Sequence, residues 1–128
     1  MLNRVPPPSE AVLSFLQERH PQTRSLVLWV RDQVLHIEPD LEERIYTGWN
    51  GLGYRYPDAG LVCAIYPQSN GQVRLQFERG IKLDDPDGVL EGTGWQTRYL
   101  TILEPDDDVM ALINQFVPEA VSRQIFRR

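Results

Sequence analysis

The chain has 128 residues, of which 41% are hydrophobic and 24% charged, a composition that fits a globular domain able to bury a core without disulfides or a structural metal. No apolar run approaches the roughly 20 residues of a membrane-spanning helix, and the first residues lack the apolar core of a signal peptide, so we expect a cytoplasmic protein with no membrane partner. The net charge of −5 argues against nucleic acid as a partner, because phosphate binding depends on clustered lysine and arginine.

Residues 1–128 are predicted to form one domain, because the sequence shows no internal repeat, low-complexity tract or linker. Residues 1–8 are a proline-rich N-terminal extension to it. The single cysteine, Cys63, cannot form an internal disulfide, which agrees with a reducing compartment. Cys63 lies within an apolar segment, and we expect its side chain to be buried.

Two helices are predicted ahead of the first strand. The first starts near Glu10, since the Ser9 hydroxyl can cap it, and ends at His20, because a residue before proline avoids the helical region. The second starts near Thr23 and carries apolar residues at helical spacing: Val27, Val30, Val34 and Ile37. This stripe predicts that it is the main packing helix.

Strands are predicted at residues 45–50, 54–56, 61–66, 73–77 and 96–103. Glycines at 51 and 53 are expected to separate the first two, and the third is expected to be central because it is apolar on both faces. Asn70-Gly71 predicts a type I′ hairpin turn, since both residues tolerate positive φ. The strand after it alternates, which directs Val73, Leu75 and Phe77 inward and leaves its other face in water.

A last helix is predicted from Pro105, which suits the first helical position, with apolar residues at Val109, Leu112, Ile113 and Phe116. Pro118 is expected to break or kink it, and Val121 and Ile125 could extend a final helical segment. The order of elements predicts an α+β fold, with an antiparallel sheet of four to five strands and the N-terminal helices and C-terminal helix packed on one face.

The sequence contains no recognisable catalytic or zinc-binding motif. His20 and His36 have no second ligand at metal-binding spacing, and no serine lies in a Gly-x-Ser-x-Gly motif. Gly92-Thr93-Gly94 lacks the spacing and the lysine of a phosphate loop. We therefore expect a binding domain rather than an enzyme, and no cofactor.

Residues 80–94 form a long connection between strands, and connections of this length in compact domains are often functional. Four acidic residues in it offer the oxygen ligands that hard divalent cations prefer: Asp84, Asp85, Asp87 and Glu91. The spacing of an EF-hand fails, because Gly94 stands where its glutamate belongs. A simple turn at 85–88 is the alternative interpretation.

Four aromatic residues flank glycines near the predicted strand ends: Trp49, Tyr54, Tyr56 and Trp95. Such rings can wall a pocket or a subunit contact, or can serve ordinary sheet packing. Glu43 and Arg98 each adjoin a strand, and we hypothesise that they form a partly buried ion pair facing a common cavity. Glu43 is also the one candidate for a perturbed acid or base.

A family resemblance rests on residues 39–43, the strand with Trp49, the strand 73–77, the loop 80–94 and Arg98. Together they resemble the YdhG-like family of bacterial domains of unknown function, and the loop is the most specific part. The resemblance implies a fold similar to that of frataxin, in which helices pack on an antiparallel sheet. Some family members are labelled iron chaperones by analogy with frataxin. This chain lacks an acidic ridge on its first helix and has Trp95 where the family usually has lysine, and residues 49–51 replace a more usual Gly-x-Pro.

The leading hypothesis is a non-enzymatic domain that binds an unknown small molecule or protein through the 80–94 loop. Its expected ligand-binding residues are Glu43, Trp49, Phe77, Leu90, Glu91, Gly92, Thr93, Gly94 and Arg98. The alternative is a chaperone-like protein that binds iron or another divalent metal through Asp84, Asp85, Asp87 and Glu91. The exposed face of the hairpin and the apolar C-terminal segment could also form a homodimer.

Overall fold

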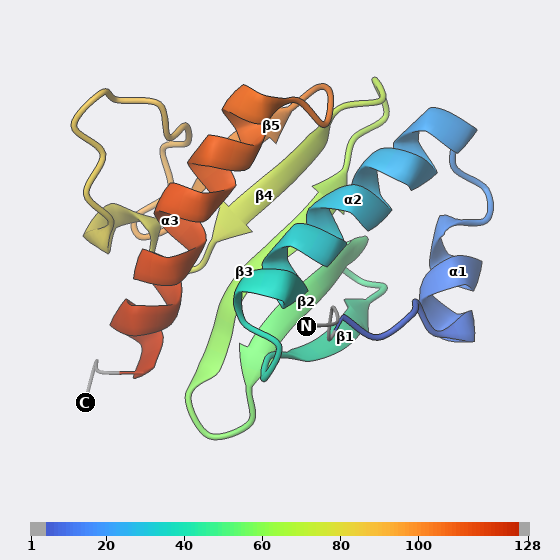
Figure 1. Ribbon diagram of the computed structural model, residues 1–128, viewed down its shortest axis with the longest axis horizontal. Helices are drawn as coiled ribbons and strands as arrows, with labels where there is room; N and C mark the ends of the chain where they lie inside the picture. Colours follow the sequence, from blue (N-terminus) through green and yellow to red (C-terminus); the bar gives the residue numbers. More distant parts are fainter. Residues whose placement is uncertain (1–4, 126–128) are drawn as a thin grey trace.

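The computed structural model describes residues 5–125, and within them three α-helices lie on one face of a five-stranded antiparallel sheet of order β1-β2-β3-β4-β5 (Figure 1). The elements are α1 (Glu10–Leu16), α2 (Pro21–Ile37), β1 (Glu42–Tyr46), β2 (Gly51–Tyr56), β3 (Gly60–Pro67), β4 (Val73–Phe77), the 3₁₀ turn η1 (Gly80–Lys82), β5 (Arg98–Ile102) and α3 (Asp107–Ile125). The predicted α+β class and the central position of β3 are confirmed. Residues 1–4 of the proline-rich extension lie outside the described part. No helix in residues 5–125 is long and apolar enough to cross a membrane.

The hydrophobic core lies between the sheet and the helices α2 and α3. The predicted stripe on α2 is confirmed, since Val27, Val30 and Val34 are fully buried. Beside α2 on the same face of the sheet, the Phe116 ring of α3 packs against Phe77 of β4 with 6.0 Å between ring centroids. The inward residues of β4 are therefore core residues, as the alternation predicted.

The junction between α1 and α2 differs from the prediction. The Ser9 Oγ accepts a hydrogen bond from the Val12 N–H at 3.2 Å, as expected of an N-cap. However, α1 ends at Leu16 and α2 already begins at Pro21. Proline is tolerated at a first helical position, because the N–H that it lacks has no partner inside the helix, and the Nδ1 of His20 caps α2 by accepting from the Gln22 N–H at 3.2 Å.

The ends of α3 also correct the prediction. Pro105 precedes the helix, and the cap is Asp106, whose carboxylate accepts from the Val109 N–H at 2.9 Å. Pro118 lies inside a helix that continues to residue 125. The carbonyl that Pro118 cannot bond belongs to Asn114, and both residues are exposed. Water can therefore replace the lost hydrogen bond, so the proline does not break the helix.

The first two strands are displaced from their predicted positions. Residues 47–50 form a turn rather than a strand, and Asn50 adopts a φ of 61° there. Gly51 and Gly53, which were expected to interrupt the strands, lie within β2 and pair with Tyr46 and Arg44 of β1. The sheet tolerates these glycines because neighbouring rings occupy the space above them, as described below.

The hairpin between β3 and β4 forms as predicted, but with a different turn. Gly71 has a φ of 90°, whereas Asn70 lacks the positive φ that a type I′ turn requires. The Gly71 N–H donates to the Gln68 carbonyl at 3.1 Å, and the Asn70 side chain accepts from the Gln72 N–H at 3.0 Å. Asn70 thus stabilises the turn through its side chain rather than through a left-handed backbone.

Cys63 lies on β3 with its side chain fully buried, as predicted. Burial raises the pKa of its thiol to about 12, and the thiolate is the reactive form. We expect native Cys63 to react with the thiol reagent DTNB at least about 100 times more slowly than in the unfolded chain. Equal rates in buffer and in guanidinium chloride would contradict the buried placement.

Candidate functional site

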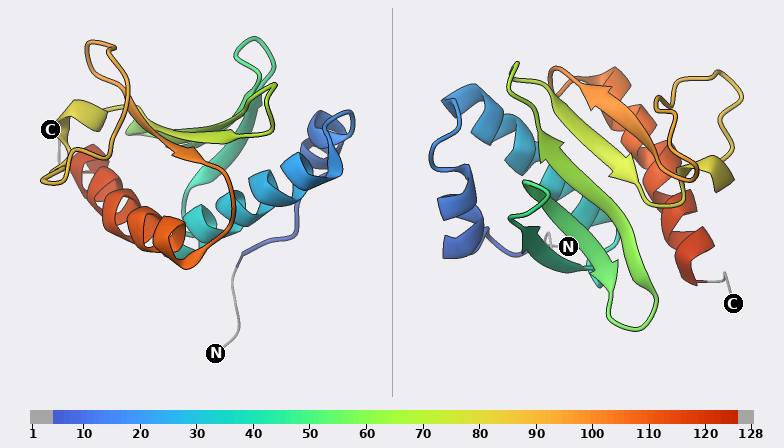
Figure 2. Two further views of the ribbon diagram at one scale, coloured as in Figure 1. Left: turned by 90° about the horizontal axis from the view of Figure 1, so that it is seen from above. Right: turned by 180° about the vertical axis from the view of Figure 1, so that it is seen from behind.

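One face of the sheet is left open by the described segments. Figure 2 shows the helices on one side of the sheet, whereas the turn 47–50 and the segment leading into β5 rise on the other side. Strand register assigns to this open face the residues that alternate with the core residues: Glu42, Arg44, Tyr46, Gly51, Gly53, Ala64, Tyr66, Arg74, Gln76, Tyr99 and Thr101. An open sheet face usually carries polar side chains, so its three tyrosines require an explanation.

Two glycines of β2 allow tyrosine rings to lie flat on this face. A Cβ placed on Gly51 would lie 2.5 Å from ring carbons of Tyr66, and one placed on Gly53 would collide with the ring of Tyr46. Contacts this close leave no room for a larger residue. The Tyr46 ring in turn stacks on Trp49, with centroids 4.8 Å apart and planes inclined by 18°. We call Tyr46, Trp49 and Tyr66, with the two glycines beneath, the aromatic platform.

Arginines differ in their surroundings on the open face. Arg44 and Arg55 both contact the carboxylate of Glu42, each at 3.1 Å. Arg74 instead lies over the ring of Tyr99, with its Cζ 4.3 Å from the ring centroid. Within residues 5–125 no carboxylate lies within ion-pair distance of its guanidinium. Arg74 is thus oriented by an aromatic ring and has no direct carboxylate partner among the described residues. Burial, and then the nearby Glu78 carboxylate, raises the pKa of Tyr66, so one acidic side chain lies close to this face.

A hollow of about 330 Å³ lies beside the platform. The described residues that line it are Trp49, Asn50, Tyr66, Pro67, Gln68, Ser69, Arg74 and Gln76. We call it the open-face hollow. Arg74 is the only charged residue in this lining, and the amides and the serine hydroxyl supply neutral donors and acceptors. The arrangement suits recognition of a small molecule with both an apolar and a polar part.

No family model, curated protein or solved structure matches this chain. The resemblance to the YdhG-like family and to the frataxin fold therefore stays a prediction. What the protein does has to be inferred from the geometry of its described residues.

Among the predicted ligand-binding residues, Trp49 lines the open-face hollow and Phe77 does not. Phe77 is fully buried and faces the helices, on the opposite side of the sheet. Two of the other aromatic candidates do not line the open-face hollow either. Tyr54 is fully buried, and the Tyr56 hydroxyl donates to Glu38. Trp95 is 84% exposed. The predicted aromatic wall thus reduces to Trp49, joined by Tyr66, which sequence reasoning missed.

The polar groups of the long loop are engaged within the loop, with β5 and with α3, where the Asp84 N–H donates to the Glu119 carboxylate. The Asp85 carboxylate accepts from the N–H groups of Val89 and Leu90, each at 2.9 Å. Glu91 pairs with Tyr99 through two backbone hydrogen bonds of 2.9 Å, which extends the sheet beyond β5. Arg98 donates to the carbonyls of residues 94 and 97, each at 2.6 Å. These contacts hold the loop against β5 and α3.

The four acidic residues of the alternative metal site do not converge. Within residues 5–125, no three His, Cys, Asp or Glu side chains lie close enough together to hold a metal ion. Asp85 caps the backbone, and Glu91 is held at the edge of β5. Asp84, Asp87, Gly92, Thr93 and Gly94 are exposed, while Leu90 packs partly against the core.

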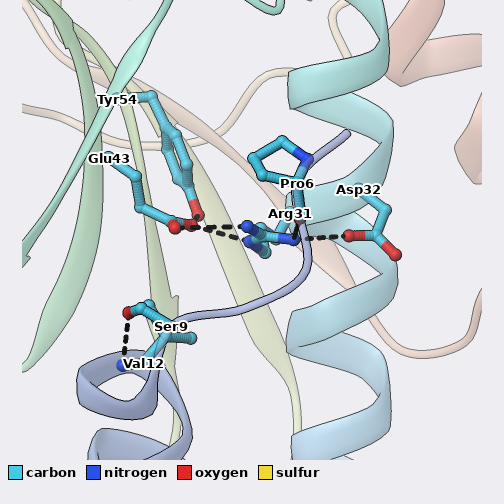
Figure 3. Close-up of polar contacts among 7 residues, drawn as sticks. All are labelled: Pro6, Ser9, Val12, Arg31, Asp32, Glu43 and Tyr54. Atoms are coloured by element: carbon cyan, nitrogen blue, oxygen red, sulfur yellow. Dashed lines mark hydrogen bonds and ion pairs between the residues drawn. The ribbon is translucent and has the colours of Figure 1, made fainter. Parts of the chain in front are cut away.

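Glu43 and Arg98 do not face a common cavity, so that hypothesis is wrong. They lie on β1 and β5, the two opposite edges of the sheet. Glu43 binds Arg31 of α2 instead, with 2.9 Å between Arg31 Nε and Glu43 Oε2 (Figure 3). The same carboxylate oxygen accepts from the Tyr54 hydroxyl at 2.7 Å.

Arg31 is the centre of this cluster and is only 1% exposed. Its Nη1 donates to the Pro6 carbonyl at 2.8 Å and to Asp32 at 3.0 Å (Figure 3). Burial, and then the Glu43 carboxylate, raises the pKa of Tyr54 well above its ordinary value. The cluster joins the N-terminal segment, α2, β1 and β2, and its polar groups are satisfied. We interpret it as structural. The sequence signal for it was an arginine directly beside the buried valine stripe.

Proposed function

We propose that the protein is a binding domain for a small molecule and that its site is the open-face hollow. The observation that carries the proposal is the aromatic platform, in which two glycines are needed for rings to lie flat on a sheet face that no described helix covers. Rings also cover glycines in ordinary sheets, so the glycines by themselves do not identify a site. What supports a binding surface is that these rings lie flat beside a hollow on an uncovered face, where they offer area for stacking.

The hollow is large enough for a small ligand, but size does not single it out, since hollows of about 1150 and 680 Å³ lie along α1 and α2. Binding pockets for small molecules typically measure about 300–1,000 Å³, and about 330 Å³ lies near the lower limit. Trp49 is 57% exposed although one ring face stacks on Tyr46. Much of its ring therefore stays available to a ligand.

The proposal moves the site away from the long loop, because no residue of 80–94 is in the lining of the open-face hollow. Of the predicted ligand-binding residues, the described lining keeps Trp49. Membership of the YdhG-like family is likewise proposed, on the sequence of the 80–94 loop and the order of helices and strands.

Trp49→Ala is expected to weaken binding of a small molecule about tenfold, since stacking on an aromatic ring contributes about 1–3 kcal/mol. A thermal-shift screen of a metabolite panel identifies the ligand. A ligand at about 100 times its dissociation constant adds about 2.7 kcal/mol to the free energy of unfolding. The same screen is run on Trp49→Ala.

Trp95→Ala is the matched control, because Trp95 is the more exposed tryptophan and does not line the hollow. Compounds that still bind Trp49→Ala but no longer bind Trp95→Ala would contradict the open-face hollow and place the site near the end of the 80–94 loop. A panel without hits would count against a small-molecule ligand and favour a protein partner.

A further inference from the structure

We infer that the ligand of the open-face hollow is a planar aromatic compound carrying a single anionic group, either a carboxylate or a phosphate. The inference rests on the proposed function, since it names the class of ligand for that same site. It combines two independent features of the lining, the aromatic platform and the charge of Arg74, which has no direct carboxylate partner among the described residues.

Arg74 is prepared to bind an anion. Its side chain is fixed by the ring of Tyr99, 4.3 Å from the guanidinium carbon, so less side-chain entropy is lost when a ligand binds. No hydrogen-bond acceptor for its guanidinium N–H groups is found within residues 5–125. A guanidinium presents a planar fork of donors that matches a carboxylate or a phosphate.

Other arginines near the open face lack this freedom. Arg55 and Arg44 share the carboxylate of Glu42, and Arg19 donates to the side chain of Asn50 at 2.6 Å. The last contact also positions Asn50, which lines the hollow. Arg19 keeps its charge, since Asn50 is neutral, but it does not line the hollow. Arg74 is the only charged side chain of the lining, which holds no acidic residue.

The platform selects a flat ring. Trp49 presents the part of its indole that Tyr46 does not cover, and Tyr66 lies flat on Gly51 beside it. Aromatic rings stack favourably in such offset arrangements. The hollow is lined by both rings and by Arg74, so one small molecule can stack and meet the guanidinium at once.

The overall charge limits the number of anionic groups. At −5 the chain repels polyanions over distances within the Debye length, and one arginine compensates one negative group. A nucleic-acid strand needs several phosphate contacts. These arguments favour a small molecule with one anionic group over a polynucleotide.

The test compares matched probes by isothermal titration calorimetry. Indoleacetate and indoleacetamide differ in one charge at nearly constant shape, and adenosine monophosphate and adenosine form the corresponding pair for phosphate. We expect at least one anion to bind tenfold or more tightly than its neutral partner. The pair that shows the difference distinguishes a carboxylate from a phosphate ligand.

Arg74→Gln is expected to abolish the preference for the anion, and Arg74→Lys to retain part of it, since lysine keeps the charge but not the fork. Arg44→Gln is the matched control, because Arg44 lies on the same face but is paired with Glu42. The affinity of the Arg44→Gln variant for the anionic probe should stay unchanged.

The outcomes separate the two claims. Equal binding of charged and neutral probes, with Trp49→Ala still weakening both, would overturn the inference and leave the proposed function standing. Failure of all four probes to bind would also overturn the inference, while the metabolite panel judges the proposed function separately. Probe binding that is indifferent to both Trp49 and Arg74 would contradict both claims.

Discussion

Replacing Arg31 with alanine is expected to lower the free energy of unfolding by about 3 kcal/mol, since removing one partner of a buried ion pair typically costs about 3–5 kcal/mol. Glu43 is 16% exposed, which places the expectation at the lower end. The variant leaves the Glu43 carboxylate without its cation and frees the Pro6 carbonyl. Urea unfolding followed by circular dichroism measures the loss, and the melting temperature should fall by about 10 °C.

Arg44→Ala is the control for Arg31→Ala. Arg44 is paired with Glu42 at 3.1 Å, but both side chains are exposed, and such pairs contribute about 0–1 kcal/mol. A double-mutant cycle of Arg31 and Glu43 should also show coupling, with the double variant less destabilised than the sum of the single variants. Equal stability of Arg31→Ala and Arg44→Ala would refute the structural role assigned to the cluster.

Gly51→Ala is expected to weaken ligand binding more than tenfold, which corresponds to about 1.4 kcal/mol. The added methyl group would lie 2.5 Å from the Tyr66 ring and 3.0 Å from the Ile65 carbonyl. The methyl group is confined between the Tyr66 ring and the Ile65 carbonyl. Since the carbonyl belongs to the sheet backbone, the Tyr66 ring has to leave its position on the platform. Titration with the tightest compound from the panel measures the affinity, and circular dichroism checks that the variant stays folded.

Gly48→Ala is the matched control for Gly51→Ala. A Cβ at Gly48 meets no atom of the described residues within 4 Å, and Gly48 is not among the glycines with positive φ. It also lies in the turn next to the hollow, so it tests whether any alanine in this region affects binding. Unchanged affinity in a folded Gly51→Ala variant would show that the flat position of Tyr66 is not needed.

Much of the fold was predictable because its signals are local. The valine stripe of α2 has helical spacing, and the alternation of Val73, Leu75 and Phe77 marks a strand with one buried face. A helix boundary was misplaced where proline can either end one helix or begin the next. Pro21 was interpreted as the end of one helix and instead starts the next.

The candidate site was less predictable because its parts come from different strands. Trp49, Tyr66 and Arg74 become neighbours only through the register of β2, β3 and β4, which a single sequence does not specify. Gly51 and Gly53 were taken for a break, since a glycine inside a strand usually marks an irregularity. The rings that explain them lie on other strands.

The long loop attracted attention by its length and its acidic residues, and both signals were ambiguous. Asp85 serves as a local cap, a common role for aspartate in turns. Glu43 was correctly identified as a paired residue, but with the wrong partner. The true partner, Arg31, is separated from it by the end of α2 and is brought close only by the packing of that helix on the sheet.

The most direct test of the open-face hollow as the binding site is amide chemical-shift mapping by NMR, with the tightest compound from the panel. The account predicts that the perturbed amides cluster in residues 47–52, 66–69 and 74–76, and that Trp49→Ala reduces the effect. Perturbations confined to residues 84–94, or to the helices on the other side of the sheet, would contradict it.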